Sequence, residues 1–353
     1  MKQRPLMVDV IPHNRPLITP ADEQAVQGVL KSGHIAQGPE VEGLEADFVT
    51  MMGDGSACAL SSGSASLFLA LYGLGIGKGQ KVAVPTYACS ALLNAVYMSG
   101  GTPSVVDVTE DTFILDPDRL DDQAPEAAAA IVVHCFGASA DVKNLRDRGI
   151  LVVEDCCQSI GGSQGSEGDV SVYSFHATKT ITGGNGGLVW ARSSQITEQI
   201  VDFRQHDCRD NYIPRFNFQM TDVQATMVRS QLSRLSEITS RRQHIYERYK
   251  NALPNFLSLQ TGLSGTSIAP YRFVVRAEDQ ETRDFMQSHM SSHGVTTIVP
   301  IERYELLHRY LELDAGAYPN AEKIVNTTLS LPLFPGLSDS EIDRILVALS
   351  KIK

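Results

Sequence analysis

Short apolar runs recur along the first two thirds of the chain, separated by segments of crossover length such as 64–72, 90–99 and 144–148. Runs that are apolar on both faces are typical of strands buried in a parallel sheet. The predicted strands are Cys58–Leu60, Lys81–Val84, Pro103–Val106, Ala130–Val133, Leu151–Val153, Val170–Ser174 and Leu188–Ala191. The pattern therefore predicts an α/β fold with a central, mostly parallel sheet of seven strands.

The pattern changes after residue 220. From Thr221 to Asn251 apolar residues recur with helical spacing, which predicts a long helix, continuous or broken, with Thr221 as its N-cap. Beyond it, two strand-like runs (271–275 and 296–299) and a closing helical region (338–352) predict a smaller α+β unit. We therefore predict a large α/β domain at residues 1–235 and a small C-terminal α+β domain at residues 236–353.

Composition narrows the class of protein. The chain has 353 residues, of which 42% are hydrophobic and 20% charged, as in an ordinary globular protein. Its formal net charge of -11 argues against broad contact with nucleic acid or an anionic membrane. No apolar run approaches the ~18 residues of a membrane span, and the segment Met1–Val10 lacks the apolar stretch of a signal peptide. We expect a cytoplasmic protein that binds neither nucleic acid nor membrane.

The cysteines show no metal-binding spacing. Most lie in apolar runs, and the adjacent pair at 156 and 157 lacks the separation of a Cys-X-X-Cys motif, so we predict reduced core residues and no metal site. The six cysteines are Cys58, Cys89, Cys135, Cys156, Cys157 and Cys208.

One lysine has a sequence context that suits covalent chemistry. Lys179 ends the run Ser174–Lys179, precedes the glycine-rich run 183–187, and lies on a predicted loop between two strands. Such a loop can present an amine to a carbonyl as a Schiff base, although a solvated lysine beside a flexible turn has the same local pattern. Asp155 ends an apolar strand, where an unpaired carboxylate is costly, and would hold a pyridine nitrogen protonated.

Two further segments suit a phosphorylated aromatic cofactor. The run Ser61–Ser66 passes from a strand into a helix, whose N-terminus could bind phosphate or could be a plain N-cap. Tyr87 follows the strand 82–84, where it could stack on a heteroaromatic ring or simply pack in the core.

Taken in order, these segments resemble the DegT-type sugar aminotransferase family, which comprises fold-type I enzymes dependent on pyridoxal 5'-phosphate. The matching runs are 38–41, 62–65, 133–137, 154–155, 174–179, 224–225 and 329–335. The resemblance implies that Lys179 forms the Schiff base with the cofactor and that Asp155 pairs with the pyridine nitrogen. It also implies that Gln158 meets the ring hydroxyl and that Tyr87 stacks on the ring.

The same resemblance assigns the remaining cofactor-binding positions. Gly63, Ser64 and Ser174 would hold the phosphate, and Cys157 stands under the ring where alanine is usual. Asn217 would reach the phosphate of the neighbouring subunit, which implies a homodimer with two shared active sites.

Three other positions also depart from the family pattern. Asn185 stands where an acidic residue is usual, Gln219 where arginine is usual, and Asp207 where glycine is usual. Because of these differences, the resemblance does not identify the substrate. Members that remove a hydroxyl carry histidine in place of the lysine, so Lys179 favours transamination over dehydration.

The resemblance implies a ping-pong transamination. An amino acid, L-glutamate by expectation, would convert the cofactor to pyridoxamine 5'-phosphate, and a keto sugar, nucleotide-linked by expectation, would accept the amine. A cyclitol ketone or a non-nucleotide sugar remains an alternative acceptor.

Two competitors come from other classes of protein. A non-catalytic, cofactor-binding regulatory protein is disfavoured because Lys179 and Asp155 are both present. A nicotinamide-dependent sugar reductase is disfavoured because the glycines at 73–79 follow a helix and not the first strand.

Overall fold

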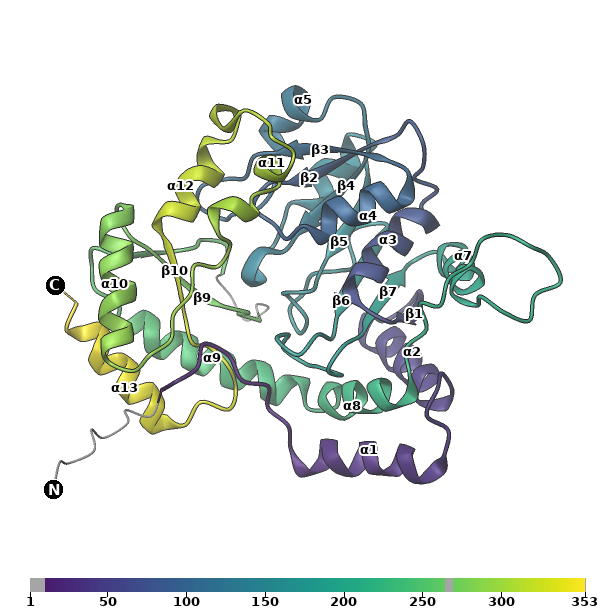
Figure 1. The fold of residues 1–353 in the computed structure, drawn as a ribbon, viewed down its shortest axis with the longest axis horizontal. Helices are drawn as coiled ribbons and strands as arrows, with labels where there is room; N and C mark the ends of the chain where they lie inside the picture. Colours follow the sequence, from purple (N-terminus) through teal and green to yellow (C-terminus); the bar gives the residue numbers. More distant parts are fainter. Residues whose placement is uncertain (1–9, 264–268, 353) are drawn as a thin grey trace, which may run out of the picture.

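A seven-stranded sheet forms the centre of the molecule, with the strand order β1-β7-β6-β5-β4-β2-β3 (Figure 1). The computed structural model describes residues 10–263 and 269–352. The strands are β1 (Ser56–Leu60), β2 (Lys81–Pro85), β3 (Thr102–Val106), β4 (Ala127–Val133), β5 (Leu151–Asp155), β6 (Val170–Ser174) and β7 (Gly187–Ala191). They confirm the predicted sheet and its mostly parallel character.

The strand β7 departs from the parallel pattern. It runs antiparallel to both of its neighbours, β6 and β1. The chain passes from β6 to β7 through a loop that contains no helix, so it re-enters the sheet from the edge at which β6 ended. That loop carries Lys179, and the return brings Gly187 opposite both Ser174 and Leu60.

Helices cover both faces of the sheet (Figure 1). Those of the larger lobe are α1 (Pro20–Ser32), α2 (Pro39–Met52), α3 (Gly63–Gly73), α4 (Ala91–Ser99), α5 (Leu120–Gln123), α6 (Val142–Asp147), α7 (Ser194–Arg204) and α8 (Asp222–Leu232). One hydrophobic core joins α3, α4 and α7 to the sheet, and another joins α2 and α8 to the opposite side of β1, β6 and β7. The result is the three-layer arrangement expected of an α/β fold.

The predicted long helix is broken. It begins with a capping box, in which Thr221 Oγ1 accepts the N–H of Gln224 and Gln224 Oε1 accepts the N–H of Thr221. The chain leaves helical geometry at Arg234, between α8 and α9 (Leu235–Asn251). The two helices run across the lower part of the molecule in Figure 1, above α1, and α9 reaches the smaller lobe.

The smaller lobe is built on a three-stranded antiparallel sheet in the order β10-β9-β8. Its strands are β8 (Ser258–Leu259), β9 (Phe273–Arg276) and β10 (Thr328–Leu331), and the remaining helices are α10 (Gln280–Ser292), α11 (Leu307–Tyr310), α12 (Pro319–Thr327) and α13 (Asp339–Ser350). The predicted strand at 271–275 is confirmed by β9. The one predicted at 296–299 is wrong, because Val295 and Ile298 form isolated bridges to different partners and no continuous ladder.

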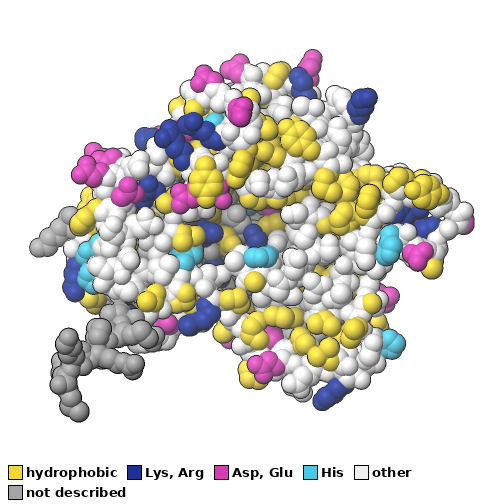
Figure 2. All heavy atoms as spheres, viewed as in Figure 1, with side chains coloured by type: hydrophobic (Ala, Val, Ile, Leu, Met, Phe, Trp, Pro, Cys, Tyr) yellow, Lys and Arg dark blue, Asp and Glu magenta, His cyan; other side chains and the backbone are white. Residues whose placement is uncertain are grey.

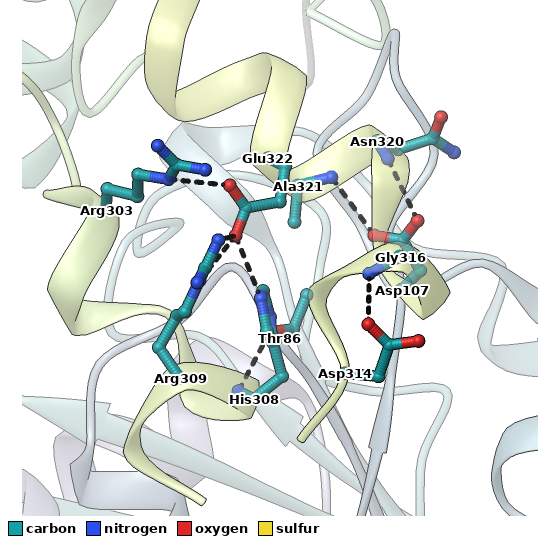
Figure 3. A network of polar contacts seen from close by, with 10 residues as sticks. All are labelled: Thr86, Asp107, Arg303, His308, Arg309, Asp314, Gly316, Asn320, Ala321 and Glu322. Atoms are coloured by element: carbon teal, nitrogen blue, oxygen red, sulfur yellow. Dashed lines mark hydrogen bonds and ion pairs between the residues drawn. The ribbon is translucent and has the colours of Figure 1, made fainter. Parts of the chain in front are cut away.

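A buried polar network fastens α11 and α12 to the large sheet (Figure 3). His308 lies between Thr86, at the end of β2, and Glu322, with 2.7 Å from Nδ1 to Thr86 Oγ1 and 3.0 Å from Nε2 to Glu322 Oε1. Nearby, the carboxylate of Asp107 accepts the N–H of Ala321 at 3.1 Å. Although α11 and α12 follow α9 in sequence, they therefore pack on the large sheet. The domain boundary at 235/236 stays a prediction.

All six cysteines are free thiols. Cys58, Cys135 and Cys156 are buried as predicted, and Cys157 is half-buried. The prediction of core residues is wrong for Cys89 and Cys208, which are exposed because one opens into a pocket beyond β2 and the other lies in the loop after α7.

Two expectations concern membranes and targeting. Within residues 10–263 and 269–352, no helix has the length and apolar character needed to cross a membrane. The amino-terminal segment, predicted to lack a signal peptide, lies outside the described residues up to residue 9.

Candidate active site

A pocket of about 280 Å³ lies at the edge of the large sheet where β1, β5 and β6 end. Asp155 and Ser174 are the last residues of adjacent strands, and Leu60 lies in the same row through its pairing with β7. Ligands of open α/β sheets gather at this edge. The residues that line the pocket are Ser62, Gly63, Ser64, Leu67, Cys89, Ala91, Asp155, Cys157, Gln158, Ser174, His176, Thr178, Lys179 and Asn185.

One end of the pocket is the N-terminus of α3. Ser62 is its N-cap, and its side chain accepts the N–H of Ala65 at 3.1 Å. A methyl group on Gly63 would lie 2.8 Å from Ser174 Cβ and 3.0 Å from its Oγ, so only glycine fits without a shift. The first N–H groups of a helix have no intrahelical acceptor, and the helix dipole favours an anion there. This end of the pocket therefore suits a phosphate group.

The other end of the pocket carries a carboxylate. Asp155 is 5% exposed, and its Oδ1 accepts the N–H of Cys157 at 3.0 Å. The Cys157 thiol also lies within hydrogen-bonding reach of this carboxylate. The carboxylate opens into the pocket, where it can accept a hydrogen bond from a ligand. Beside it, Gln158 Oε1 accepts the N–H of Phe136 at 2.9 Å, which leaves the amide NH₂ of this pocket residue as a donor.

The carboxylate preceding Asp155 has a structural role. Glu154 is buried and contacts His134, with 2.9 Å from Oε2 to Nε2, and it also accepts the N–H groups of Gly165 and Glu167. Burial alone would raise the pKa of Glu154, but these hydrogen bonds outweigh it and lower the pKa. Glu154 and His134 also lie close enough to Cys156 to form a metal-ligand set. Because the Glu154 oxygens are already engaged by these donors, we regard the group as a structural support for the loop after β5.

Lys179 lies on a tightly packed loop. Its two ends are joined by hydrogen bonds from Phe175 N–H to Gly186 O (2.9 Å) and from Gly183 N–H to Phe175 O (3.0 Å). Gly186 has a φ of 134°, and a side chain there would collide with Met220. The glycine-rich run is therefore a packing requirement and not merely a flexible turn.

The side chain of Lys179 reaches into the pocket near a buried tyrosine. Its Nζ lies 5.3 Å from the centroid of the Tyr271 ring. Burial lowers the pKa of the Lys179 ammonium, but Tyr271, Cys157 and Asp155 act in the opposite direction and leave the pKa above its ordinary value. Lys179 therefore holds its proton more tightly than an ordinary lysine.

The structure brings most of the predicted site residues together in this pocket. Those that line it are Gly63, Ser64, Asp155, Cys157, Gln158, Ser174 and Lys179. The exposed Asn217 does not line it, and its side chain accepts the N–H of Gln219 at 3.2 Å.

Tyr87 is not placed in the pocket. It is 1% exposed, and its ring packs 5.7 Å from the ring of Phe113 in a hydrophobic core. Beyond β2 the chain turns, so the residue of this segment that faces the pocket is Cys89, two positions further on. From this segment, the pocket therefore contains the thiol of Cys89 and not the predicted ring of Tyr87.

Sequence reasoning assigned no role to several other lining residues. His176 and Thr178 belong to the run that ends at Lys179, and Ser62 and Asn185 belong to the quoted serine-rich and glycine-rich runs. Their position beside predicted site residues in the sequence could have indicated that they line the pocket. The sequence gives no such indication for Leu67 and Ala91, because each has the pattern of an ordinary helical residue.

Comparison with known proteins identifies the family. The model of the DegT/DnrJ/EryC1/StrS aminotransferase family matches residues 16–350. The chain therefore belongs to this family of enzymes.

Solved structures with the same fold span nearly the whole chain. DesV of S. venezuelae, in complex with a ketimine intermediate, is 30% identical, with 94% of this chain and 93% of DesV covered and a TM-score of 0.86. Spr1654 of Streptococcus pneumoniae, named as a sugar aminotransferase and solved in its PMP form, is 25% identical over 97% of both chains, with a TM-score of 0.89. NtdA of Bacillus subtilis, with bound PMP, is 25% identical over 99% of this chain and 86% of its own, with a TM-score of 0.88.

Proposed function

We propose that this enzyme transfers an amino group from L-glutamate to a keto sugar carried on a nucleotide, with pyridoxal 5'-phosphate as cofactor and a ping-pong mechanism. The carrying observation is that Lys179, Asp155 and the N-terminus of α3 open into one pocket at the carboxyl edge of the sheet. The forms in which Spr1654 and NtdA were solved support the cofactor, and the naming of Spr1654 supports a sugar substrate.

The residues of the pocket fit the cofactor at both of its ends. The N–H groups at the start of α3 and the hydroxyl of Ser174 would hold the phosphate, and the Oδ2 of Asp155 would hold a proton on the pyridine nitrogen. The amide NH₂ of Gln158 would donate to the ring hydroxyl. The cofactor supplies an aldehyde that binds amines and a ring that withdraws electrons from the attached carbon.

Lys179 is the residue proposed for the covalent and acid–base roles. With the cofactor bound, its Nζ would bond to the aldehyde carbon and would be freed when an amino acid takes its place. The free amine would then act as the base that removes the proton from the carbon bearing the donor's nitrogen, and as the acid that gives a proton back during transfer to the acceptor. The hydrogen bonds between the ends of the Lys179 loop hold its backbone in place, and the contact of Nζ with the Tyr271 ring positions the side chain beside the pocket.

The first test follows the cofactor by absorption. The purified protein is loaded with pyridoxal 5'-phosphate, L-glutamate is added, and the visible band is expected to give way to the near-ultraviolet band of the amine form. Borohydride reduction of the loaded protein should fix the cofactor on Lys179 by peptide mass, and Lys179→Ala should lose the adduct. A stable adduct on another lysine would contradict the assignment. Regeneration of the visible band by a nucleotide-linked keto sugar, by its nucleotide-free form or by a cyclitol ketone then identifies the acceptor.

We further propose a homodimer in which Asn217 reaches the phosphate in the neighbouring subunit. The support is its exposed position outside the pocket of its own chain. Lys179→Ala and Asn217→Ala proteins should each be impaired, and mixed dimers should recover activity because one of their two sites carries neither substitution. If mixing restores nothing while subunit exchange is demonstrated, the shared site is disproved.

A further inference from the structure

A second, smaller pocket adjoins the Lys179 loop. It has a volume of about 140 Å³, and Thr178 lines both this pocket and the one that contains Lys179. On the face shown in Figure 2, Lys, Arg and His side chains lie in the hollow between the two lobes. The residues that line the second pocket are His13, Asn14, Thr178, Arg242, Tyr271, Arg272, Ile298, Leu331 and Leu333.

Among the described residues, no carboxylate pairs with the guanidinium of Arg272. Its Nε and Nη1 are buried and have no hydrogen-bond partner within residues 10–263 and 269–352. Its nearest aromatic neighbours are the rings of Phe136 (5.7 Å) and Tyr271 (5.5 Å). The adjacent Arg242 differs, because it donates to the carbonyl groups of Pro270 and Tyr271. A half-buried guanidinium whose two inner nitrogen atoms have no partner is unfavourable, and an anionic ligand would relieve that cost.

The surroundings of Arg272 favour an anion. Among the described residues that line the pocket, none is an aspartate or a glutamate. Burial and the nearby Arg272 charge lower the pKa of His13 to about 3, so this histidine is neutral at physiological pH. His13 instead shares a hydrogen bond with Ser330, with 2.9 Å from Nε2 to Oγ. The described lining of the pocket therefore combines positively charged side chains with no acidic one.

The pocket is connected to the reactive lysine through one aromatic ring. Lys179 Nζ and the Arg272 guanidinium lie 5.3 Å and 5.5 Å from the same Tyr271 ring centroid. The Tyr271 hydroxyl donates to Thr178 O at 3.2 Å, which fixes the ring against the lysine loop. Arg272 also lies over Phe136, whose N–H is held by Gln158 of the main pocket. Arg272 thus shares two aromatic neighbours, Tyr271 and Phe136, with residues of the main pocket.

We propose that Arg272 binds a carboxylate of the amino-acid donor and thereby selects an amino acid over a simple amine. This inference rests on the proposed function and extends it by a donor-binding residue. A carboxylate matches the planar fork of a guanidinium, and about 140 Å³ accommodates such a group with a short carbon chain but not a nucleotide. A phosphate of the acceptor is the competing source of negative charge, and the test separates the two.

The test uses the cofactor-loaded protein and three variants. Arg272→Met removes the charge, and Arg272→Lys keeps it without the fork. Arg248→Met is the matched control, because Arg248 forms a surface ion pair with Asp343 and does not line the pocket. The apparent Kd for L-glutamate in the first half-reaction is expected to rise by about 10- to 100-fold in Arg272→Met, since charge-assisted hydrogen bonds are lost. Arg272→Lys should be intermediate, and Arg248→Met should match the wild type.

A second readout does not depend on turnover. Glutarate, a dicarboxylate without an amine, should bind the loaded wild-type protein by calorimetry and should not bind Arg272→Met. Inorganic pyrophosphate serves as the phosphate probe. Binding of pyrophosphate in place of glutarate, or an unchanged Kd for glutamate in a folded Arg272→Met protein, would overturn the inference. If Arg272→Met fails to fold, the same comparison is made with Arg272→Lys, for which wild-type affinity for both glutamate and glutarate would overturn it.

The same experiments separate failure of the inference from failure of the proposed function. If the wild type converts glutamate and Arg272→Met does so equally well, the proposed transaminase function is supported and the proposed carboxylate site at Arg272 is refuted. If glutamate leaves the wild-type spectrum unchanged but glutarate binds in an Arg272-dependent manner, the carboxylate site stands and L-glutamate as donor falls.

Discussion

Replacing Gly63 by alanine tests the phosphate end of the pocket most directly. The added methyl would lie 2.8 Å from Ser174 Cβ and 3.0 Å from Ser174 Oγ, whereas unstrained carbon atoms stay about 3.5–4.0 Å apart. Overpacking of this kind costs about 1–3 kcal/mol. Relief requires the start of α3 to move away from β6, which displaces the N–H groups proposed to hold the phosphate. Losing one such charge-assisted hydrogen bond, worth about 1.5–3 kcal/mol, should raise the Kd for pyridoxal 5'-phosphate by roughly 10- to 100-fold.

The assay is a spectroscopic titration of the apoprotein with the cofactor, combined with urea unfolding. Gly77→Ala is the matched control, because its nearest neighbouring atom is Ser99 O at 3.9 Å and no clash follows. The double change Gly63→Ala with Ser174→Gly removes the Ser174 side chain from the crowded contact and should recover most of the lost stability. A Gly63→Ala protein that binds the cofactor with wild-type affinity would refute the proposed phosphate site, even if its stability falls.

Three further predictions concern the buried carboxylate of Glu154, the helical Gly28 and the pocket thiol of Cys89. Glu154→Gln should lower the free energy of unfolding by about 3 kcal/mol, because a buried pair with His134 is broken. Because the pKa of Glu154 is lowered in the folded protein, the contribution of Glu154 to stability is present above about pH 4.5 and is lost as the pH falls further. Urea unfolding of the variant should therefore depend less on pH in that acid range than unfolding of the wild type. Gly28→Ala should raise the free energy of unfolding in urea by about 0.5–1 kcal/mol, because Gly28 lies inside α1 with no atom within 4 Å of the added methyl. Pyridoxal 5'-phosphate should protect Cys89, in the pocket, from alkylation measured by mass spectrometry, while the exposed Cys208 serves as the internal control; equal labelling of Cys89 with and without cofactor would place the ring elsewhere.

Part of the site was predictable because it follows directly from strand ends. Asp155 and Ser174 each terminate an apolar strand, and parallel strands deliver their carboxyl ends to one edge. Lys179 lies on the loop between two such strands, and Gly63 begins the helix after another. In each case local sequence was enough to place the residue at the edge where the pocket forms.

Other parts depend on geometry that a local pattern does not encode. Tyr87 and Cys89 lie in the same turn, and which of them faces the pocket depends on how the chain bends beyond β2. Asn217 belongs to an exposed segment whose proposed role needs a second chain. Arg272 lies almost a hundred residues after Lys179, and only packing of the small sheet against the lysine loop brings the two near one ring. Packing between segments that are distant in the sequence, and not local secondary-structure propensity, sets the positions of these residues.

The buried contacts of His308 also determine how the molecule can move. Because His308 and Asp107 fasten α11 and α12 to the large sheet, these helices must travel with it as one body. The small sheet is tied to the same body at a second place, because Tyr271 donates its hydroxyl to Thr178 O and its N–H to Phe136 O. Arg272, which lies between Tyr271 and β9, is therefore held in a set position relative to the lysine loop. The second pocket thus owes its shape to contacts that join the two lobes and not to the small sheet alone.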